Sequence, residues 1–263
     1  MMCKQLLGVN KSTTNIAVLL ELGLLPISFH AIKAAIKNWE RIRLKEAHKY
    51  VISSHLQAVS KNLPWISNIR NLLQQNGLIC LYLDTHEDKR PFIHKKLLQR
   101  LSDQFHQNSF TVLKDHQSKL RTYGLLKTEI GTENYLQQIT DFKVRKCYTK
   151  FRLSDHTLNI EQGRHNGIEK SERFCPFCTN QVETEIHFLI QCQAYNSPRE
   201  ELFETLLKTR PSFNYYTPTE KFKYLLSEDL ALSSAKYIHK CFQIRNFNLI
   251  PKAIPFNIFS LII

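Results

Sequence analysis

Four residues of metal-binding types lie close together in the second half of this 263-residue sequence. Cys175, Cys178, His187 and Cys192 have the spacing Cys-x2-Cys-x8-His-x4-Cys. Two cysteines three positions apart can direct both sulfurs at one point, and Cys₃His is an established tetrahedral zinc set. Thiolate ligands favour zinc over magnesium or calcium. Because four protein ligands leave no open position, the spacing predicts a structural zinc ion and not a catalytic one.

The second half of the motif makes a demand on local structure. His187 and Cys192 are five residues apart, which is about 140° around an ideal helix. The helix expected to begin near Thr184 must therefore loosen before Cys192 if both side chains are to reach one ion. Two alternatives stay open, namely a chance cluster of buried thiols and the replacement of one ligand by His165. The other cysteines are isolated and are expected to be buried apolar side chains: Cys3, Cys80, Cys147 and Cys241.

The elements that must position these residues are predicted to be helices. The chain has only 7 glycines, which favours helices over a turn-rich β fold. Apolar residues recur every three or four positions over residues 26–45 and over residues 65–76, which end at an Asn-Gly turn. Residues 78–83 fit either a short strand or the start of a buried helix. Further helices are expected over residues 93–140, 142–153 and about 231–245, and after capping boxes that begin at Ser197 and Thr217.

Basic residues are concentrated in the first half of the chain. The sequence has 36 Lys and Arg against 23 Asp and Glu, for a net charge of +13, and residues 1–150 alone carry +12. This imbalance favours a polyanionic partner, although it can also serve solubility. Like charges four apart slightly destabilise a helix, so each basic stripe either faces an anion or is a solvated face. The stripes consist of Lys33, Lys37, Arg41 and Lys45, and of Lys143, Lys146 and Lys150.

Membrane insertion, secretion and catalysis are not expected from the sequence. The apolar stretches 16–29 and 247–263 are interrupted by charged residues or prolines and fall short of the roughly 20 residues of a membrane-spanning helix. The first residues lack the regions of a signal peptide, so we expect an intracellular protein, nuclear or cytoplasmic, with free thiols or metal-bound ones. No two Asp residues are adjacent, and no Walker-type glycine loop or His-Glu-x-x-His helix occurs, which predicts no enzymatic activity.

A longer pattern surrounds the cysteines. Residues 152–164, RLSDHTLNIEQGR, precede the turn that Cys175 and Cys178 are expected to form, which we call the knuckle. The segments ETEIHFL (183–189) and Cys192-x2-Tyr195 follow it. This arrangement resembles the carboxy-terminal segment of reverse transcriptases from LINE-type (non-long-terminal-repeat) retrotransposons. There an Arg-Leu-x-x-x-His-x-Leu-x-Ile-Glu-x-Gly-Arg stretch precedes a cysteine/histidine zinc motif. Residues 3–13 resemble the stretch just after the polymerase palm, so the resemblance covers most of residues 1–247.

The resemblance implies a mainly α-helical fold in four segments. These are a thumb-like helical segment (1–60), a helical connector (61–140), a basic helix with the zinc module (141–210), and C-terminal helices with an irregular apolar tail (211–263). It also implies a fragment that lacks the palm's Tyr-x-Asp-Asp strand and has no catalytic residue. Such a fragment would bind RNA or DNA largely non-specifically through the basic helices, with Phe174 and Phe177 either stacking on bases or packing the knuckle. The alternative is a host-adapted helical domain that is stabilised by zinc and binds proteins. Its basic surface would then have no role in binding nucleic acid.

Overall fold

The chain is mainly α-helical, as the sequence predicts. The computed structural model describes residues 2–43, 47–83, 92–114 and 119–249 and contains no β-sheet in this part of the chain. Two compact units form, an inserted unit (Leu19–Asp115) and a terminal unit (Met1–Val18 with His116–Ile263). The four segment boundaries drawn from the resemblance stay a prediction. None of the described helices combines the length and the apolar character that crossing a bilayer requires.

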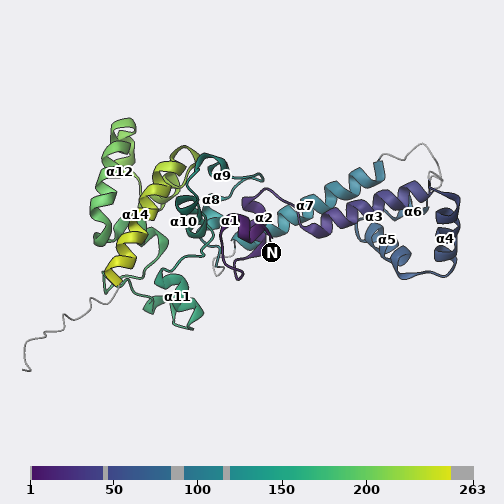
Figure 1. The fold of residues 1–263 in the computed structure, drawn as a ribbon, viewed down its shortest axis with the longest axis horizontal. Helices are drawn as coiled ribbons and strands as arrows, with labels where there is room; N and C mark the ends of the chain where they lie inside the picture. Colours follow the sequence, from purple (N-terminus) through teal and green to yellow (C-terminus); the bar gives the residue numbers. More distant parts are fainter. Residues whose placement is uncertain (1, 44–46, 84–91, 115–118, 250–263) are drawn as a thin grey trace, which may run out of the picture. The chain divides into compact units, whose positions relative to one another are not determined.

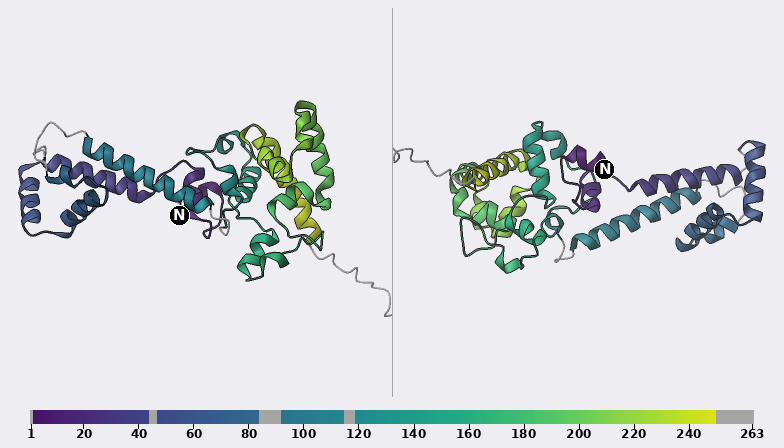
Figure 2. Two further views of the ribbon diagram at one scale, coloured as in Figure 1. Left: turned by 180° about the vertical axis from the view of Figure 1, so that it is seen from behind. Right: turned by 60° about the horizontal axis from the view of Figure 1, so that its bottom comes forward.

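The inserted unit is built from helices, four of which (α3, α5, α6 and α7) contribute to one apolar core. The longest of them, α3 and α7, lie side by side in Figures 1 and 2. Trp39 is buried on α3, and its ring stacks on Tyr82 with centroids 5.6 Å apart. The same core contains Ile36, Leu73 and Leu97, which are fully buried. The helices of this unit are α3 (Ile27–Arg43), α4 (Lys49–Ser60), α5 (Pro64–Gln75), α6 (Ile79–Leu83) and α7 (Phe92–Lys114).

Helix α5 ends at the Asn-Gly turn that the sequence predicts. Gly77 has φ of +65°, which a residue without a Cβ adopts at little cost. The N–H of Gly77 donates to the Gln74 carbonyl, and the N–H of Leu78 donates to the Leu73 carbonyl. This pair of bonds is the Schellman pattern, which satisfies the last carbonyls of a helix. Residues 79–83 then form α6, so the short strand that the sequence left open does not form.

The terminal unit contains the cysteine motif. In Figures 1 and 2, α10 and α14 lie side by side at its centre, and α14 also packs against α12. Its α-helices are α1 (Met2–Leu7), α8 (Tyr123–Leu126), α9 (Tyr135–Gln138), α10 (Phe142–Arg152), α11 (Asn159–His165), α12 (Asn196–Thr209), α13 (Pro218–Leu225) and α14 (Ala231–Leu249), while α2 (Asn15–Glu21) spans the boundary between the units. Short turns join them: 3-10 helices η2 (Lys170–Glu172), η4 (Gln193–Tyr195), η5 (Pro211–Tyr215) and η6 (Glu228–Leu230), and a π-helix η3 (His187–Gln191).

Aromatic and cysteine side chains form one continuous core in the terminal unit. Phe188 lies at its centre, with its ring centroid 4.6 Å from that of Tyr195 and 4.8 Å from that of Phe242. Cys175 and Cys192 belong to this core and are almost fully buried. The cysteine motif is therefore part of the hydrophobic core and not an appended loop.

The two predicted capping boxes have different outcomes. Thr217 forms one, because its hydroxyl accepts the Glu220 N–H and the Glu220 carboxylate accepts the Thr217 N–H. The box expected at Ser197 is wrong. A 3-10 turn leads directly into α12, so the helix begins at Asn196, its N-cap position is Tyr195, and no side chain caps it.

Candidate metal centre

The structure brings the four predicted ligands to one point. One donor atom from each of Cys175, Cys178, His187 and Cys192 lies within 4.8 Å of all the others. The Cys192 Sγ atom is 3.8 Å from the Cys175 Sγ and 3.6 Å from the Cys178 Sγ. A tetrahedral ion with metal–sulfur bonds of about 2.3 Å places two sulfurs about 3.8 Å apart, whereas a disulfide needs about 2.05 Å. The cluster therefore has the dimensions of a Cys₃His group that could hold a metal ion such as zinc.

The first two candidate ligands, Cys175 and Cys178, lie on a tight knuckle. An antiparallel bridge between Phe174 and Val182 closes its base. The Cys175 N–H donates to the Gln181 carbonyl at 2.7 Å, and the Gln181 N–H donates to the Cys178 carbonyl at 2.9 Å. The backbone N–H groups of residues 177 and 178 also donate to the Cys175 sulfur. These bonds fix both sulfurs on the same side of the turn and place donors beside a sulfur that carries charge when it binds a metal.

The last two ligands lie on a widened helical turn. The Thr184 hydroxyl accepts the His187 N–H at 3.0 Å and so caps the start of this helix. From His187 to Gln191 the helix is of the π type, and the Cys192 N–H donates to the His187 carbonyl at 2.8 Å. An i to i+5 bond widens the helical turn, so His187 and Cys192 lie closer to the same side than they would in an α-helix. The loosening that the spacing requires before Cys192 is thus a π turn.

Two side chains from other helices donate to carbonyl oxygens at the end of this turn. The Leu189 carbonyl accepts from the Arg199 Nε at 3.0 Å and from the Tyr237 hydroxyl at 2.6 Å. Arg199 also donates to the Cys192 carbonyl at 2.5 Å and to the Asn196 side chain at 2.8 Å. Both Arg199 and Tyr237 are buried. The π turn is therefore anchored to α12 and α14 by hydrogen bonds in a region of low dielectric constant, where such bonds are strong.

Two buried glutamates tie the knuckle and the π turn to the rest of the unit. Glu183 accepts two bonds from Arg245 at 2.8 and 2.9 Å, and also accepts the Asn159 N–H. Glu185 accepts from Arg121 at 2.8 Å and lies 3.1 Å from the Nε2 atom of His156. Burial acts to raise the pKa of Glu185, but the hydrogen bond and charge of His156 and the charge of Arg121 outweigh it and lower that pKa to about 2. The carboxylate is thus held ionised.

The donor chemistry of His187 fits a metal. Its side chain is 2% exposed, and neither ring nitrogen has a hydrogen-bond partner in the described residues. Leaving buried polar atoms unpaired is costly, whereas coordination of one nitrogen removes part of that cost. Burial lowers the pKa of His187, which keeps the ring neutral, and burial raises the pKa of Cys175 and of Cys192. His165, the possible substitute, is not part of the group and lies 3.3 Å from Arg164.

The stretch that precedes the knuckle has structural contacts throughout. Arg152 donates to Glu133 at 2.6 Å and lies over the ring of Tyr135. A Cβ on Gly163 would lie 2.6 Å from the Cγ of Arg173, whose guanidinium donates to the carbonyls of residues 160 and 168. Gly163 is therefore required by close packing and not by its backbone angles. This stretch supports the knuckle.

The aromatic side chains beside the knuckle differ in exposure. Phe177 packs on the core of the terminal unit and meets Tyr195 edge to face at 6.1 Å. Phe174 is exposed, and its carbonyl accepts from the Asn159 side chain at 2.7 Å. Only the Phe174 ring is thus placed where a base could reach it.

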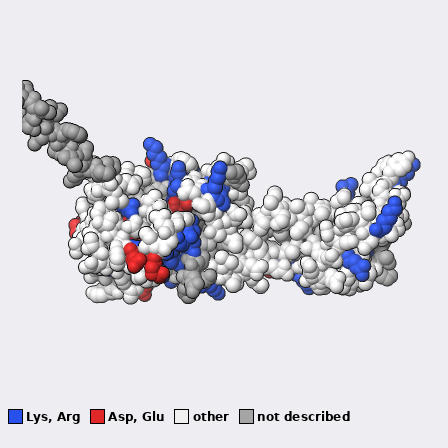
Figure 3. Space-filling model, turned by 90° about the horizontal axis from the view of Figure 1, so that it is seen from below, with Lys and Arg blue, Asp and Glu red and all other residues white. Residues whose placement is uncertain are grey.

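The basic stripes lie on two helices in different units. On α3, Lys33, Lys37 and Arg41 are exposed and make no ion pair in the described residues, and Lys45 lies outside the described part of the chain. Figure 3 shows one face of the molecule, where Lys and Arg predominate over Asp and Glu on the inserted unit. The second stripe lies on α10, where two lysines are exposed and Lys150 is half-buried.

Comparisons of this chain with protein-family models, with curated proteins and with solved structures find no match. The sequence argument identifies the four donors but misses the residues that hold them in place. Arg199 lies inside the capping box expected at Ser197, and Tyr237 and Arg245 lie in a predicted helix without any pattern that marks them. The one available signal was the pair of acidic residues, Glu183 and Glu185, four and two positions before His187.

Proposed function

We propose that the terminal unit is a zinc-stabilised module in which the ion has a structural role. The observation that carries this proposal is the convergence of three sulfurs and one unpartnered imidazole within 4.8 Å. The ion would be held by Cys175, Cys178, His187 and Cys192. It would thereby cross-link the knuckle to the π turn. Binding of this kind contributes on the order of 10 kcal/mol to folding. Four protein ligands leave no position for a substrate, and we propose no catalytic role.

We further propose that the chain binds RNA or DNA, largely non-specifically, as part of a retrotransposon reverse transcriptase. The supporting observations are the net charge of +13, the exposed stripe of Lys33, Lys37 and Arg41 on α3, and the resemblance around the cysteines. Cations without ion-pair partners can contact phosphates directly, and each phosphate contact releases counterions. Lys143, Lys146 and Lys150 on α10 provide a second cationic face in the terminal unit.

The metal role is tested by metal analysis of the purified chain. We expect about one zinc per chain, and a cobalt-substituted sample with the absorption of a tetrahedral thiolate site. Cys178→Ser removes the half-exposed ligand and should lose the metal to a competing chelator, whereas Cys80→Ser removes an exposed thiol outside the cluster and should retain it. A metal-free wild-type chain, or equal metal retention by the two variants, would contradict the proposal.

The nucleic-acid role is tested by measuring affinity at several salt concentrations. The triple variant Lys33→Ala, Lys37→Ala, Arg41→Ala should bind duplex DNA more weakly and with a log–log salt slope smaller by roughly 2 to 3, because each lost phosphate contact removes about 0.9. A matched control replaces three other exposed lysines of the inserted unit: Lys61, Lys95 and Lys114. Equal slopes for the stripe and control variants would remove the role of α3. Absence of micromolar binding by the wild type would favour the protein-interaction alternative.

A further inference from the structure

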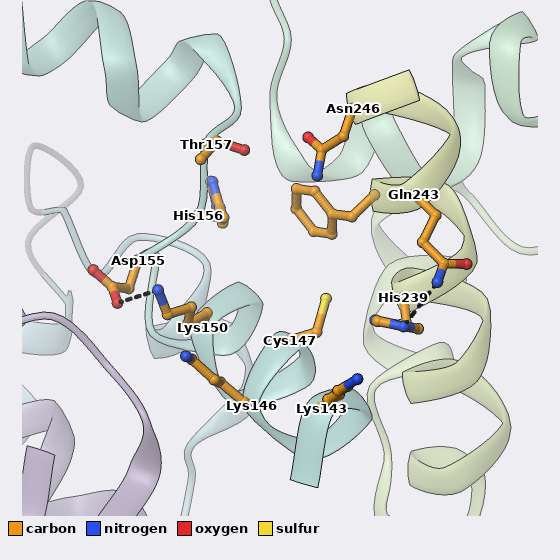
Figure 4. A pocket seen from close by; sticks show the side chains of 11 residues that line it. Lys143, Lys146, Cys147, Lys150, Asp155, His156, Thr157, His239, Gln243 and Asn246 are labelled. Atoms are coloured by element: carbon orange, nitrogen blue, oxygen red, sulfur yellow. Dashed lines mark hydrogen bonds and ion pairs between the residues drawn. The ribbon is translucent and has the colours of Figure 1, made fainter. Parts of the chain in front are cut away.

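A pocket of about 360 Å³ lies in the terminal unit between α10, α14 and the segment that follows α10. Figure 4 shows Lys143, Lys146 and Lys150 of α10 on one side of it and the polar side chains of α14 on the other. None of the four cysteine-motif residues lines this pocket. Its volume is in the range of pockets that enclose small organic groups.

The lining of the pocket includes an aromatic ring that core rings support. Phe242 lines the pocket and is half-buried. Its centroid lies 4.8 Å from that of Phe188 and 6.3 Å from that of Phe151, so core rings support it from within. Cys147 lies beside it, and burial raises the pKa of this thiol to about 12, which keeps it an apolar group. A supported ring with an open side is a platform for a flat π-system.

The rim on α10 is positively charged. Lys143 and Lys146 are exposed and have no ion-pair partner in the described residues. Asp155 is the one acidic lining residue, and Lys150 lies 3.8 Å from it. Both carboxylate oxygens of Asp155 also accept hydrogen bonds from Asn10, one from its backbone N–H at 2.8 Å and one from its side-chain amide at 3.0 Å. Two lysines are therefore left to attract an anion at the edge of the pocket.

The rim on α14 carries groups that both donate and accept hydrogen bonds. His239, Gln243 and Asn246 lie at spacings of four and three residues, so they share one face of the helix. Figure 4 shows them along the side opposite the lysines, with the Gln243 amide 3.2 Å from the His239 ring. The amides of Gln243 and Asn246 are exposed, and amide side chains can pair with the donor and acceptor edge of a base.

We propose that this pocket binds one nucleotide of a single-stranded nucleic acid. The base stacks on Phe242, its edge meets the amides of α14, and its phosphate lies at the edge formed by Lys143 and Lys146. The proposal rests on the nucleic-acid binding proposed above and adds to it one site that accepts only an unpaired base. In a duplex both faces of a base are already stacked, so a paired base cannot enter. An acidic peptide could meet the lysines but would leave the Phe242 ring and the amides unused.

The experiment measures binding of the full zinc-loaded chain to a labelled 12-nucleotide RNA of mixed sequence and to its duplex. Phe242→Leu should weaken binding of the single strand by about tenfold or more, and Phe242→Tyr, which keeps the ring, should restore it. Lys143→Ala with Lys146→Ala should weaken binding and reduce the salt slope on single strands by roughly 1.4. Lys208→Ala with Lys236→Ala removes the same charge from exposed positions that do not line the pocket and should leave the affinity within about twofold.

The outcomes separate this inference from the broader proposal. If the wild type binds neither RNA nor DNA, both fail together. If it binds RNA and the α3 stripe variant is impaired, but Phe242→Leu and Phe242→Tyr bind as the wild type does, only the pocket proposal is overturned. Three other results would also overturn it. Phe242→Leu could lose duplex binding as much as single-strand binding, so that the ring would not select an unpaired base. Micromolar AMP could displace the RNA, so that the ligand would be a free nucleotide, or an oligoglutamate peptide could bind more tightly than the RNA, so that the ligand would be an acidic peptide. Circular dichroism and zinc content, unchanged in each variant, show that a loss reflects the pocket and not unfolding.

Discussion

The hydrogen bonds to the Leu189 carbonyl offer a quantitative test of how the π turn is held. Arg199 and Tyr237 both donate to this oxygen, so removal of either leaves it one partner. Tyr237→Phe should cost about 1 kcal/mol, the usual net value of one buried hydrogen bond. Arg199→Met should cost about 2 kcal/mol, because the Cys192 carbonyl also loses a charged donor and keeps only the longer bond from the Tyr195 N–H, at 3.3 Å.

The double variant should be worse than the sum of the single variants. With both donors gone, the Leu189 carbonyl is buried without a partner, which adds about 1 to 2 kcal/mol to the expected sum of about 3 kcal/mol. The non-additivity is therefore the property that distinguishes a shared acceptor from two independent contacts. Because the same turn positions His187 and Cys192, the double variant should also lose zinc to a chelator more readily than either single variant.

The assay is equilibrium urea unfolding of the zinc-loaded protein, followed by circular dichroism, together with zinc transfer to a colorimetric chelator. Lys240→Met is the matched control on α14, since Lys240 pairs with Glu201 at 2.8 Å on the exposed surface and such pairs contribute about 0–1 kcal/mol. Additive free energies, within about 0.3 kcal/mol, would refute the argument that Leu189 depends on both donors. Unchanged zinc transfer in the double variant would refute the argument that the π turn positions the ligands.

Gly163→Ala should lower the free energy of unfolding by about 1–3 kcal/mol in urea titrations, because the new Cβ displaces a hydrogen-bonded arginine side chain; unaltered stability would show that this arginine moves freely. Thr217→Ala should lower the free energy of unfolding by about 0.5–2 kcal/mol, because it removes a helix cap. Ser197→Ala should lower it less, because the Ser197 hydroxyl caps no helix, and a larger loss at Ser197 than at Thr217 would contradict the assigned start of α12. At pH 8, iodoacetamide should modify Cys147 far more slowly than exposed Cys80, because a pKa of about 12 leaves roughly 10⁻⁴ of the Cys147 thiol ionised; equal rates measured by mass spectrometry would contradict this.

Local patterns in the sequence account for much of the fold. The apolar periodicity of residues 26–45 and 65–76 corresponds to α3 and α5, and the Asn-Gly turn ends α5 by a bond pattern that needs only a few consecutive residues. The sequence of residues 78–83 is ambiguous, because a run of six apolar residues is compatible with both a buried strand and a helix. Residues 79–83 form a helix, and the described part of the chain contains no strand with which they could pair. The capping box at Ser197 failed because a preceding 3-10 turn started the helix earlier.

The identities of the four donor residues and the need for a loosened turn could be derived from the sequence, because ligand chemistry and helical geometry depend on residue type and spacing alone. The form of that turn, and the side chains that hold it, were decided by tertiary structure. Arg199 and Tyr237 meet Leu189 from 10 and 48 positions away. Such pairings follow from how helices pack around a shared core, and no pattern within a single helix encodes which carbonyl a distant side chain will reach. The pocket lined by Lys143 likewise exists only because α10, the segment that follows it and α14 come together in the fold.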